Sequence, residues 1–343
     1  MFKSATVRSG DVPSTQTNFP SYVDLDRLGI TTLAEAQSVR VYADEAKTTE
    51  WAREIVSVTE MHVKVPSLTS TVEIFVDWDG VRADYAVGAT YGRNAVWSDY
   101  ILVFHGEESS TTEVTDSVSG LVGTKRGANT PTEAAGQIGK AQSNTSPDSP
   151  SNFIIFNDSS INAWGNGDGT AQAWYKEPAS GTRASGMLID KRLASNRPLG
   201  LGLISGKAQA YIYDGSNFPF VIGSVDVQDT AWHHLHVVRD VSGNNIVYTD
   251  GVNVGSTTDT TRTNLSNSTQ LTIFGRSADE GDAVNGFIDE VRLRNAVLTA
   301  TWIETEYNNQ NDEATFWGTW TDAGGGDGGG AAQAARRGAV MMM

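Results

Sequence analysis

The chain has 343 residues, 39% of them apolar and 19% charged, so it can bury a core and lacks the composition of a disordered protein. At roughly 150 residues per domain, this length predicts about two domains. Its 25 Lys and Arg against 41 Asp and Glu give a formal charge of −16. That charge argues against binding to nucleic acid or to anionic membranes. The absence of cysteine excludes disulfide scaffolds, thiolate metal sites and thiol nucleophiles.

The distribution of residue types predicts an all-β protein. Thirty-five glycines and many Ser, Thr, Asn and Asp separate short apolar runs, a pattern typical of strands joined by turns. The first ten residues lack the apolar stretch of a secretory signal. No run of about 18 apolar residues occurs, so no transmembrane segment is predicted.

Residues 1–110 predict a small β-rich, sandwich-like N-terminal domain. Met61–Val65 alternates apolar and polar residues, and Pro66 is expected to end that strand. Val72–Trp78 alternates in the same way before a turn at Asp79-Gly80. Tyr100–Phe104 is a continuous apolar run, which is typical of a strand buried on both faces.

The remainder divides into a linker or lead-in over residues 111–151, a β-sandwich over 152–320 and a Gly-rich, flexible tail over 321–343. A short helix is predicted over Thr299–Asn309, capped by Thr299 or Thr301, with Ala300, Ile303 and Tyr307 as its buried stripe. The predicted strands of the sandwich are Phe153–Phe156, Ala171–Tyr175, Leu199–Ile204, Ala208–Tyr213, Trp232–Arg239, Asn245–Thr249, Gln270–Phe274 and Phe287–Arg294.

Several motifs of the second half resemble the concanavalin A-like, laminin-G-like jelly roll. They are the Trp-His-His start of Trp232–Asp240, the strand that ends in Asp250-Gly251, the last core strands at Leu271–Gly275 and Gly286–Leu293, and the closing helix. Asp116-Ser117 and Gly136–Ala141 resemble the usual lead-in, so the resemblance covers about residues 115–318. It implies a jelly-roll β-sandwich but not one function, because this fold carries lectins, glycosidases, adhesion modules and spacers.

Residues 10–108 resemble a β-rich domain of unknown function that commonly precedes such jelly rolls in secreted microbial proteins. The motifs are Asn18–Pro20, His62–Pro66, Val96–Tyr100 and Phe104-His105. Those relatives begin with a signal peptide, which this sequence lacks. Its Gly-rich tail ending in Ala, Arg and Met is more similar to a virion structural protein of a tailed phage.

No catalytic residue is assigned from the sequence. Retaining glycosidases of this fold need two carboxylates about 5.5 Å apart on one strand, and the nearest pairs are Asp24/Asp26 and Asp77/Asp79. The segment Gly165–Gly169 is interpreted as a hairpin turn and not as a phosphate loop. His234 and His236 point to one face of a strand, but no third metal ligand follows at local spacing, so hydrogen-bonded structural histidines are the favoured interpretation.

The resemblance also implies a calcium ligand. Related jelly rolls often use the aspartate at the position of Asp289, and Asn157 and Asp158 would contribute if the first and last strands are neighbours. Ca²⁺ needs six to eight oxygen ligands, so Asp289 alone is insufficient. A structural calcium ion is the only cofactor expected, and the alternative is that Asp289 hydrogen-bonds backbone amides.

The predicted function is a non-enzymatic carbohydrate-binding or adhesion module on a virion or cell surface. Sugar faces stack on aromatic rings, and Tyr211, Tyr213, Phe218 and Phe220 frame the turn Asp214–Asn217. Expected partners are glycans such as a host-surface polysaccharide, and other virion proteins or further copies of this chain through the N-terminal domain or tail. The alternatives are a purely structural virion component, such as a head decoration or tail fibre, and a divergent glycoside hydrolase.

Overall fold

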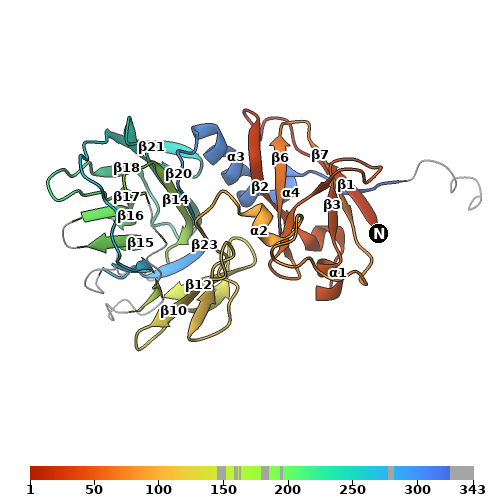
Figure 1. Cartoon of the computed structure of the whole chain (residues 1–343), viewed down its shortest axis with the longest axis horizontal. Coiled ribbons are helices and arrows are strands. Elements are labelled where there is room, and N and C mark those ends of the chain that lie inside the picture. The colour runs from red at the N-terminus through yellow and green to blue at the C-terminus, as the bar shows by residue number, and fades with distance from the viewer. Residues whose placement is uncertain are drawn as a thin grey trace, which may run out of the picture.

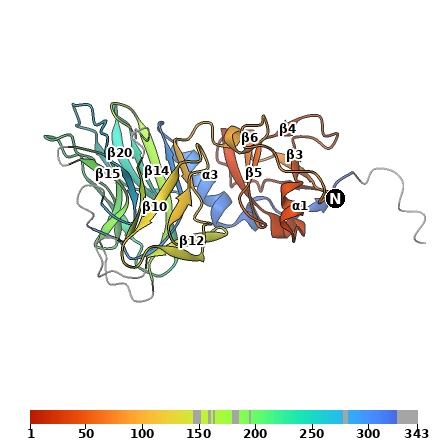
Figure 2. The same cartoon turned by 60° about the horizontal axis from the view of Figure 1, so that its bottom comes forward.

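The structure is a computed structural model that describes residues 1–144, 152–157, 161, 164–178, 185–193, 196–276 and 282–324. With 44% strand and 10% helix, it confirms the all-β fold class. Figure 1 shows two lobes, an N-terminal lobe and a β-sandwich, with helix α3 (Ala300–Asn311) between them. In the turned view of Figure 2, α3 again lies between the two lobes.

The N-terminal lobe contains two antiparallel sheets, of order β24-β1-β7-β3-β4 and β2-β6-β5. The strands of the first are β1 (Phe2–Thr6), β3 (Arg40–Tyr42), β4 (Glu50–Trp51), β7 (Glu73–Asp77) and β24 (Thr321–Asp322). Those of the second are β2 (Gln16–Asp24), β5 (Arg53–Ile55) and β6 (Glu60–Leu68). Short helices are η1 (Leu25–Leu28), α1 (Leu33–Gln37), α2 (Arg93–Val96) and α4 (Glu313–Phe316).

One sheet of the sandwich has the order β18-β17-β16-β15-β22-β13-β10-β9. Its strands are β9 (Glu113–Thr115), β10 (Val122–Arg126), β13 (Phe153–Phe156), β15 (Gly186–Leu193), β16 (Asn196–Ile204), β17 (Lys207–Ala210), β18 (Val221–Asp226) and β22 (Leu271–Ile273).

The other sandwich sheet has the order β11-β12-β23-β14-β19-β20-β21, and β8 also pairs with β23. Its strands are β8 (Leu102–Phe104), β11 (Thr132–Ala135), β12 (Lys140–Asn144), β14 (Gly169–Lys176), β19 (Trp232–Arg239), β20 (Asn244–Thr249), β21 (Val252–Thr258) and β23 (Gly286–Arg294).

Strand β19 shows how the second sheet comes to be covered on both faces. Alternation places Leu235 and Val237 in the core between the sandwich sheets. The next residue, Val238, points to the other face and belongs to the core of the N-terminal lobe, together with Trp302 and Ile303 of α3. Helix α3 and the N-terminal lobe therefore cover the outer face of this sheet.

The predicted C-terminal helix is present, but its buried stripe differs from the prediction. Thr299 caps it, because its hydroxyl accepts a hydrogen bond from the Trp302 backbone N–H at 3.1 Å. Ile303 is buried as predicted, whereas Ala300 is exposed and Tyr307 is half-buried. The helix turns polar side chains inward because the face that it covers is itself polar; the buried set is Trp302, Ile303, Thr305, Glu306, Asn309 and Gln310.

Of two local predictions in the N-terminal part, one is wrong and the other is confirmed. Pro66 does not end its strand, since β6 continues to Leu68. Val72–Trp78 contains β7, and Ile74, Val76 and Trp78 are buried as the alternation predicts.

The proposed domain boundaries stay a prediction, but some pairings cross them. Strand β8, within the expected N-terminal domain, pairs with β23 of the sandwich. The expected lead-in contributes β9–β12 to the two sandwich sheets. Most of the expected tail lies outside the described residues, and its first part contains β24, which pairs with β1.

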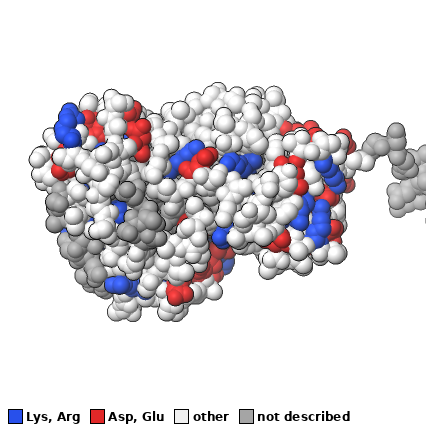
Figure 3. Space-filling model, in the orientation of Figure 1, with Lys and Arg blue, Asp and Glu red and all other residues white. Residues whose placement is uncertain are grey.

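Charge is mixed over the visible surface. On the face drawn in Figure 3, Lys and Arg side chains lie scattered among Asp and Glu. Among the described residues, no helix is both long enough and apolar enough to span a bilayer.

Candidate functional site

The four aromatic residues that the sequence singled out form one cluster, hereafter the aromatic cluster. The Tyr211 and Phe218 rings lie 4.4 Å apart between centroids, edge to face, and Phe218 stacks with Phe220 at 5.1 Å. Tyr213 lies 6.3 Å from Phe218. Phe218 is 44% exposed, whereas the other three side chains are half-buried. The cluster therefore presents aromatic surface to solvent between β17 and β18.

A buried ion pair supports the cluster from below. The Arg197 guanidinium lies 3.8 Å from the Tyr211 ring centroid and contacts Asp190 at 3.0 Å. Both charged residues are buried, and Arg197 also pairs with Tyr213 through two backbone hydrogen bonds. Because Ile212 points into the sandwich core, both tyrosines are held on the opposite side.

Asp214 fixes the turn that carries the rings. Its carboxylate accepts hydrogen bonds from the backbone N–H groups of Ser216, Asn217 and Arg262 at 2.9, 2.6 and 2.7 Å. Burial opposes ionisation, but these bonds and one from the Asn217 side chain outweigh it and hold the pKa of Asp214 below its usual range. The bond from Arg262 joins this turn to the 259–266 loop.

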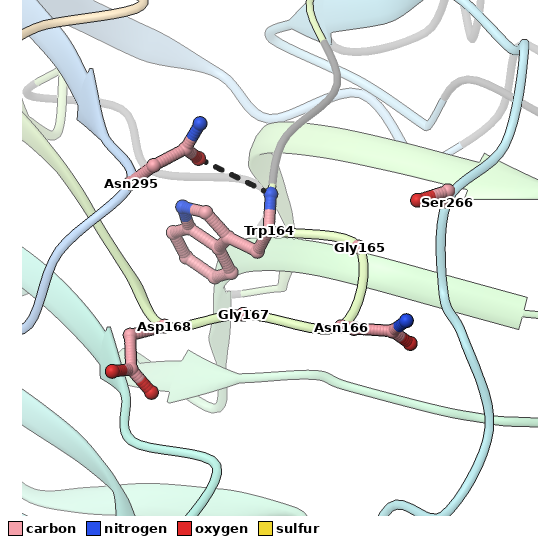
Figure 4. A pocket seen from close by; sticks show the side chains of 7 residues that line it. All are labelled: Trp164, Gly165, Asn166, Gly167, Asp168, Ser266 and Asn295. Carbon is pink, nitrogen blue, oxygen red and sulfur yellow. Dashed lines mark hydrogen bonds between the residues drawn. The ribbon is translucent and has the colours of Figure 1, made fainter.

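Two polar hollows lie beside that loop. The first has a volume of about 310 Å³ and is lined by Trp164, Gly165, Asn166, Gly167, Asp168, Ser266 and Asn295 (Figure 4). The second, of about 300 Å³, is lined by Asn166, Arg239, Val241, Thr261, Arg262 and Thr263. Asn166 belongs to both hollows, so amide, carboxylate and hydroxyl groups are available along one end of the sandwich.

Arg239 holds the loops around the hollows in place. It is buried at the end of β19 and donates to Asp259 at 3.0 Å. It also donates to the carbonyl oxygens of Trp164 and Gly165 at 3.3 and 3.2 Å and to the Thr261 hydroxyl at 3.0 Å. One side chain thus fixes both the 164–168 and the 259–261 loops.

We expect Gly169→Ala to disrupt the first hollow. A Cβ at Gly169 would lie 1.9 Å from ring atoms of Trp164, whose indole N–H is bonded to the Arg294 carbonyl at 3.1 Å. The ring cannot move without losing that bond, so a loss of about 1–3 kcal/mol of unfolding free energy is expected in urea. Gly167→Ala is the matched control, since its nearest neighbour lies at 3.8 Å; equal stability of the two variants would contradict the prediction.

The residues expected to bind calcium are not brought together. Asp289 is fully buried in β23, where it accepts a hydrogen bond from the Ile138 N–H at 2.9 Å, and its Oδ1 has no hydrogen-bond partner. Asn157 is exposed and follows β13, which belongs to the other sheet. That expectation required the first and last strands to be neighbours, and they are not. Asp158 lies outside the described residues, and calcium at this place stays a prediction.

The His234/His236 pair acquires a third neighbour that the sequence did not indicate. Glu306 of α3 lies 3.4 Å from His236 Nε2, and the side-chain oxygen of Gln172 accepts a hydrogen bond from the same nitrogen at 3.1 Å. His234 is fully buried and stacks on Trp174 at 4.6 Å, but neither of its ring nitrogens has a hydrogen-bond partner. The predicted hydrogen bonding is therefore correct for His236 and wrong for His234.

Sequence reasoning missed the polar hollows and Glu306 for different reasons. The Gly165–Gly169 segment was visible as a turn, and a cluster of Gly, Asn and Asp is typical of loops that line sites. Glu306 lies 70 positions from His236, so no spacing rule connects the two residues.

Comparison with known proteins supports the observed architecture. Residues 148–304 match the family model of the concanavalin A-like lectin/glucanases superfamily. No curated protein matches the sequence.

Solved structures with a similar fold include two bacterial domains. The binding domain of Paraclostridial Mosquitocidal Protein 1 has a TM-score of 0.50 at 15% identity, over 61% of this chain and 52% of that one. Domain 4 of AbnA, a GH43 extracellular arabinanase from Geobacillus stearothermophilus solved with arabinotriose, has a TM-score of 0.48 at 19% identity, over 60% and 97%. The chain thus spans about half of the first of these domains.

The two-sheet sandwich, its strand motifs and the family match agree, and they confirm the resemblance read from the sequence. The chain carries a jelly-roll domain of the concanavalin A-like lectin/glucanases superfamily.

Proposed function

We propose that this chain is a non-enzymatic carbohydrate-binding protein and that the aromatic cluster is its sugar-contacting surface. The observation that carries the proposal is the exposed, mutually packed set of rings around Phe218. A sugar ring presents C–H groups that stack on aromatic faces. An exposed phenylalanine held by half-buried neighbours is already oriented for such a contact, which lowers the entropy cost of binding.

The surroundings of the cluster supply the polar part of a sugar site. Hydroxyl groups of a glycan need donors and acceptors beside the stacking surface. The hollow that contains Arg262 and Asn166 lies beside the Asp214–Asn217 turn, because the Arg262 backbone N–H is hydrogen-bonded to the Asp214 carboxylate. A chain of several sugar units would reach from the rings toward these groups.

The comparisons support this class of ligand. The matched superfamily includes lectins and glucanases by its description, and the binding domain of Paraclostridial Mosquitocidal Protein 1 shares the fold. A glycan of a host surface is the proposed partner. The virion or cell-surface location, and assembly with virion proteins or further copies of the chain, remain predictions from the sequence.

The two carboxylate pairs that come nearest to the glycosidase pattern, Asp24/Asp26 and Asp77/Asp79, make contacts that favour a role in binding over hydrolysis. Asp24 caps η1 by accepting from the Asp26 N–H at 3.0 Å. Asp79 accepts from the backbone N–H groups of Val81 and Arg82, each at 2.8 Å. These carboxylates are engaged in turns of the N-terminal lobe, so we propose no glycosidase role for them.

The test is a glycan-array screen of the whole chain, with calcium and again with EDTA, followed by calorimetry on the best ligand. Phe218→Ala is expected to weaken binding at least about tenfold, which equals 1.4 kcal/mol. Glycan binding that is present with calcium and lost with EDTA would assign a metal ion to the sugar site. Equal glycan binding in both conditions would show that the sugar site needs no metal ion.

Phe287→Ala is the matched control. Phe287 is a half-buried phenylalanine on β23, in the other sheet, where it pairs with Trp232. It is expected to bind like the unaltered chain. The proposal is wrong if no glycan binds or if Phe218→Ala and Phe287→Ala have equal affinity, and release of reducing sugar would favour the hydrolase alternative.

A further inference from the structure

Four side chains that the proposed function does not use meet where the two lobes join. Glu60 and His62 belong to β6 of the N-terminal lobe, His105 follows β8, and Glu290 belongs to β23. All four are buried, with exposed fractions of 0%, 0%, 5% and 0%. One nitrogen or oxygen atom of each lies within 4.8 Å of the corresponding atom of all the others.

A β-bulge brings Glu290 to this place. Ile288, Val291 and Leu293 point into the sandwich core, so strict alternation is interrupted between positions 288 and 291. Glu290 has a φ of 49°, and the β14–β23 register shifts there. The extra residue turns Glu290 out of the apolar core and toward the N-terminal lobe.

Four ligand-type atoms lie close enough together to surround one tetrahedral ion. His62 Nε2 lies 2.9 Å from Glu60 Oε1 and 3.8 Å from Glu290 Oε1. His105 Nδ1 lies 3.3 Å from Glu60 Oε1 and 2.5 Å from Glu290 Oε1. Zinc bonds of about 2.0–2.1 Å in a tetrahedron separate neighbouring ligand atoms by about 3.3 Å, a value that these four distances bracket.

The next layer of contacts is typical of a metal site. His105 Nε2 lies 3.2 Å from Glu54, and Glu54 also accepts from the Ser117 hydroxyl at 2.8 Å. A carboxylate on the far ring nitrogen orients a metal-bound histidine. The second oxygen of Glu290 accepts from Arg292 Nε at 3.0 Å, and its first oxygen faces the two histidines.

Two further observations favour a cation. Glu60 Oε2 is buried without a hydrogen-bond partner, which is costly for a carboxylate oxygen. Glu54, Glu60 and Glu290 also outnumber the fixed positive charge at this place, which is that of Arg292.

We propose that Glu60, His62, His105 and Glu290 form a buried tetrahedral site for a zinc-type divalent cation that joins the two lobes. Two imidazoles and two carboxylates are a ligand set that zinc accepts. Because all four residues are buried, the ion enters as the lobes come together during folding and is exchanged slowly afterwards.

In a metal-free arrangement, the same side chains are joined by hydrogen bonds. In it His105 is protonated between Glu290 and Glu54, and Arg292 Nη2 donates to His62 Nδ1 at 3.5 Å. That arrangement predicts no metal uptake, so metal content separates the two states.

The experiment refolds the whole chain from denaturant with a chelator or with Zn²⁺, removes free ion and measures bound metal. One equivalent per chain and a higher Tm with zinc are expected. Refolding with Co²⁺ gives an independent readout, the visible absorption of a tetrahedral N/O site. Glu60→Gln and His62→Gln should weaken zinc binding at least about 100-fold.

Two control variants identify the site. His233→Gln removes a buried histidine that contacts Asp229 and Asp250, and this variant should bind zinc normally. His236→Gln tests the His234/His236/Glu306 group. Zinc binding that is lost in His236→Gln but kept in Glu60→Gln would overturn the proposal. The proposal would also be wrong if the unaltered chain refolds equally well with zinc and with chelator and contains no metal after refolding with zinc. If Glu60→Gln does not fold, the cobalt spectrum of the unaltered chain tests the proposal: the absorption of a tetrahedral N/O site supports it, and the absence of that absorption contradicts it.

Discussion

Arg292→Met is expected to lower the free energy of unfolding by about 3–5 kcal/mol, because it leaves two buried carboxylates without their partner. Arg292 is fully buried and donates to Glu306 at 2.8 Å and to Glu290 at 3.0 Å. It therefore connects α3 with β23 on the face that the N-terminal lobe covers. Methionine keeps the aliphatic stem but removes the charge, and urea unfolding monitored by tryptophan fluorescence measures the loss.

Arg294→Met is the matched control, two positions further along β23. Its side chain is 17% exposed and lies 3.5 Å from Asp99, which is 36% exposed. A loss of about 1 kcal/mol or less is expected for such a partly solvated pair. The double variant Arg292→Met/Glu306→Gln should recover part of the loss. Equal losses for the two arginines would show that the buried charges do not stabilise the junction.

Arg239→Met, at the end of β19 in the same sheet, is expected to have a similarly large effect of about 3–5 kcal/mol. It leaves Asp259, which is 5% exposed, without its ion pair. Carbonyl oxygens of the 164–167 loop lose their donor at the same time. The prediction is checked by urea unfolding and, under the proposed function, by weaker glycan binding as the hollows lose their shape.

Arg262→Met is the control for this loop. Arg262 is exposed, and its side chain donates to the Thr261 carbonyl at 2.8 Å. Its contact with Asp214 is made by the backbone N–H and survives the substitution. A change within about 0.5 kcal/mol is expected. If Arg239→Met were as mild as Arg262→Met, the buried hydrogen bonds of Arg239 would not be what fixes the loops.

Strands with strong local patterns could be predicted from the sequence. Trp232–Arg239 and Phe153–Phe156 have the predicted bounds, because alternation or continuous apolarity is a property of neighbouring residues. The alternation of Tyr211, Ile212 and Tyr213 also correctly placed the two tyrosines on one side. These features need no knowledge of which strands pair.

Features that depend on distant partners could not be predicted. The bulge at Glu290 reverses the alternation of β23 in a segment that resembles a regular strand, and the buried His105 that contacts Glu290 there lies 185 positions away in the sequence. The predicted calcium site needs Asn157 and Asp289 on neighbouring strands, but their strands lie in different sheets. His62, His105 and Glu290 lie on separate segments, and only tertiary folding brings them together.

The pairing of β24 with β1 also has a consequence for synthesis on the ribosome. Strand β1 forms at the beginning of the chain, but its edge partner, Thr321–Asp322, emerges roughly 300 residues later. The core of the N-terminal lobe likewise awaits Trp302, Phe316 and Trp317. At about 5–20 residues per second, the first lobe is exposed without these partners for on the order of 15–60 s. A chaperone that binds nascent chains is expected to bind this lobe, because its first strands are made well before the segments that complete it.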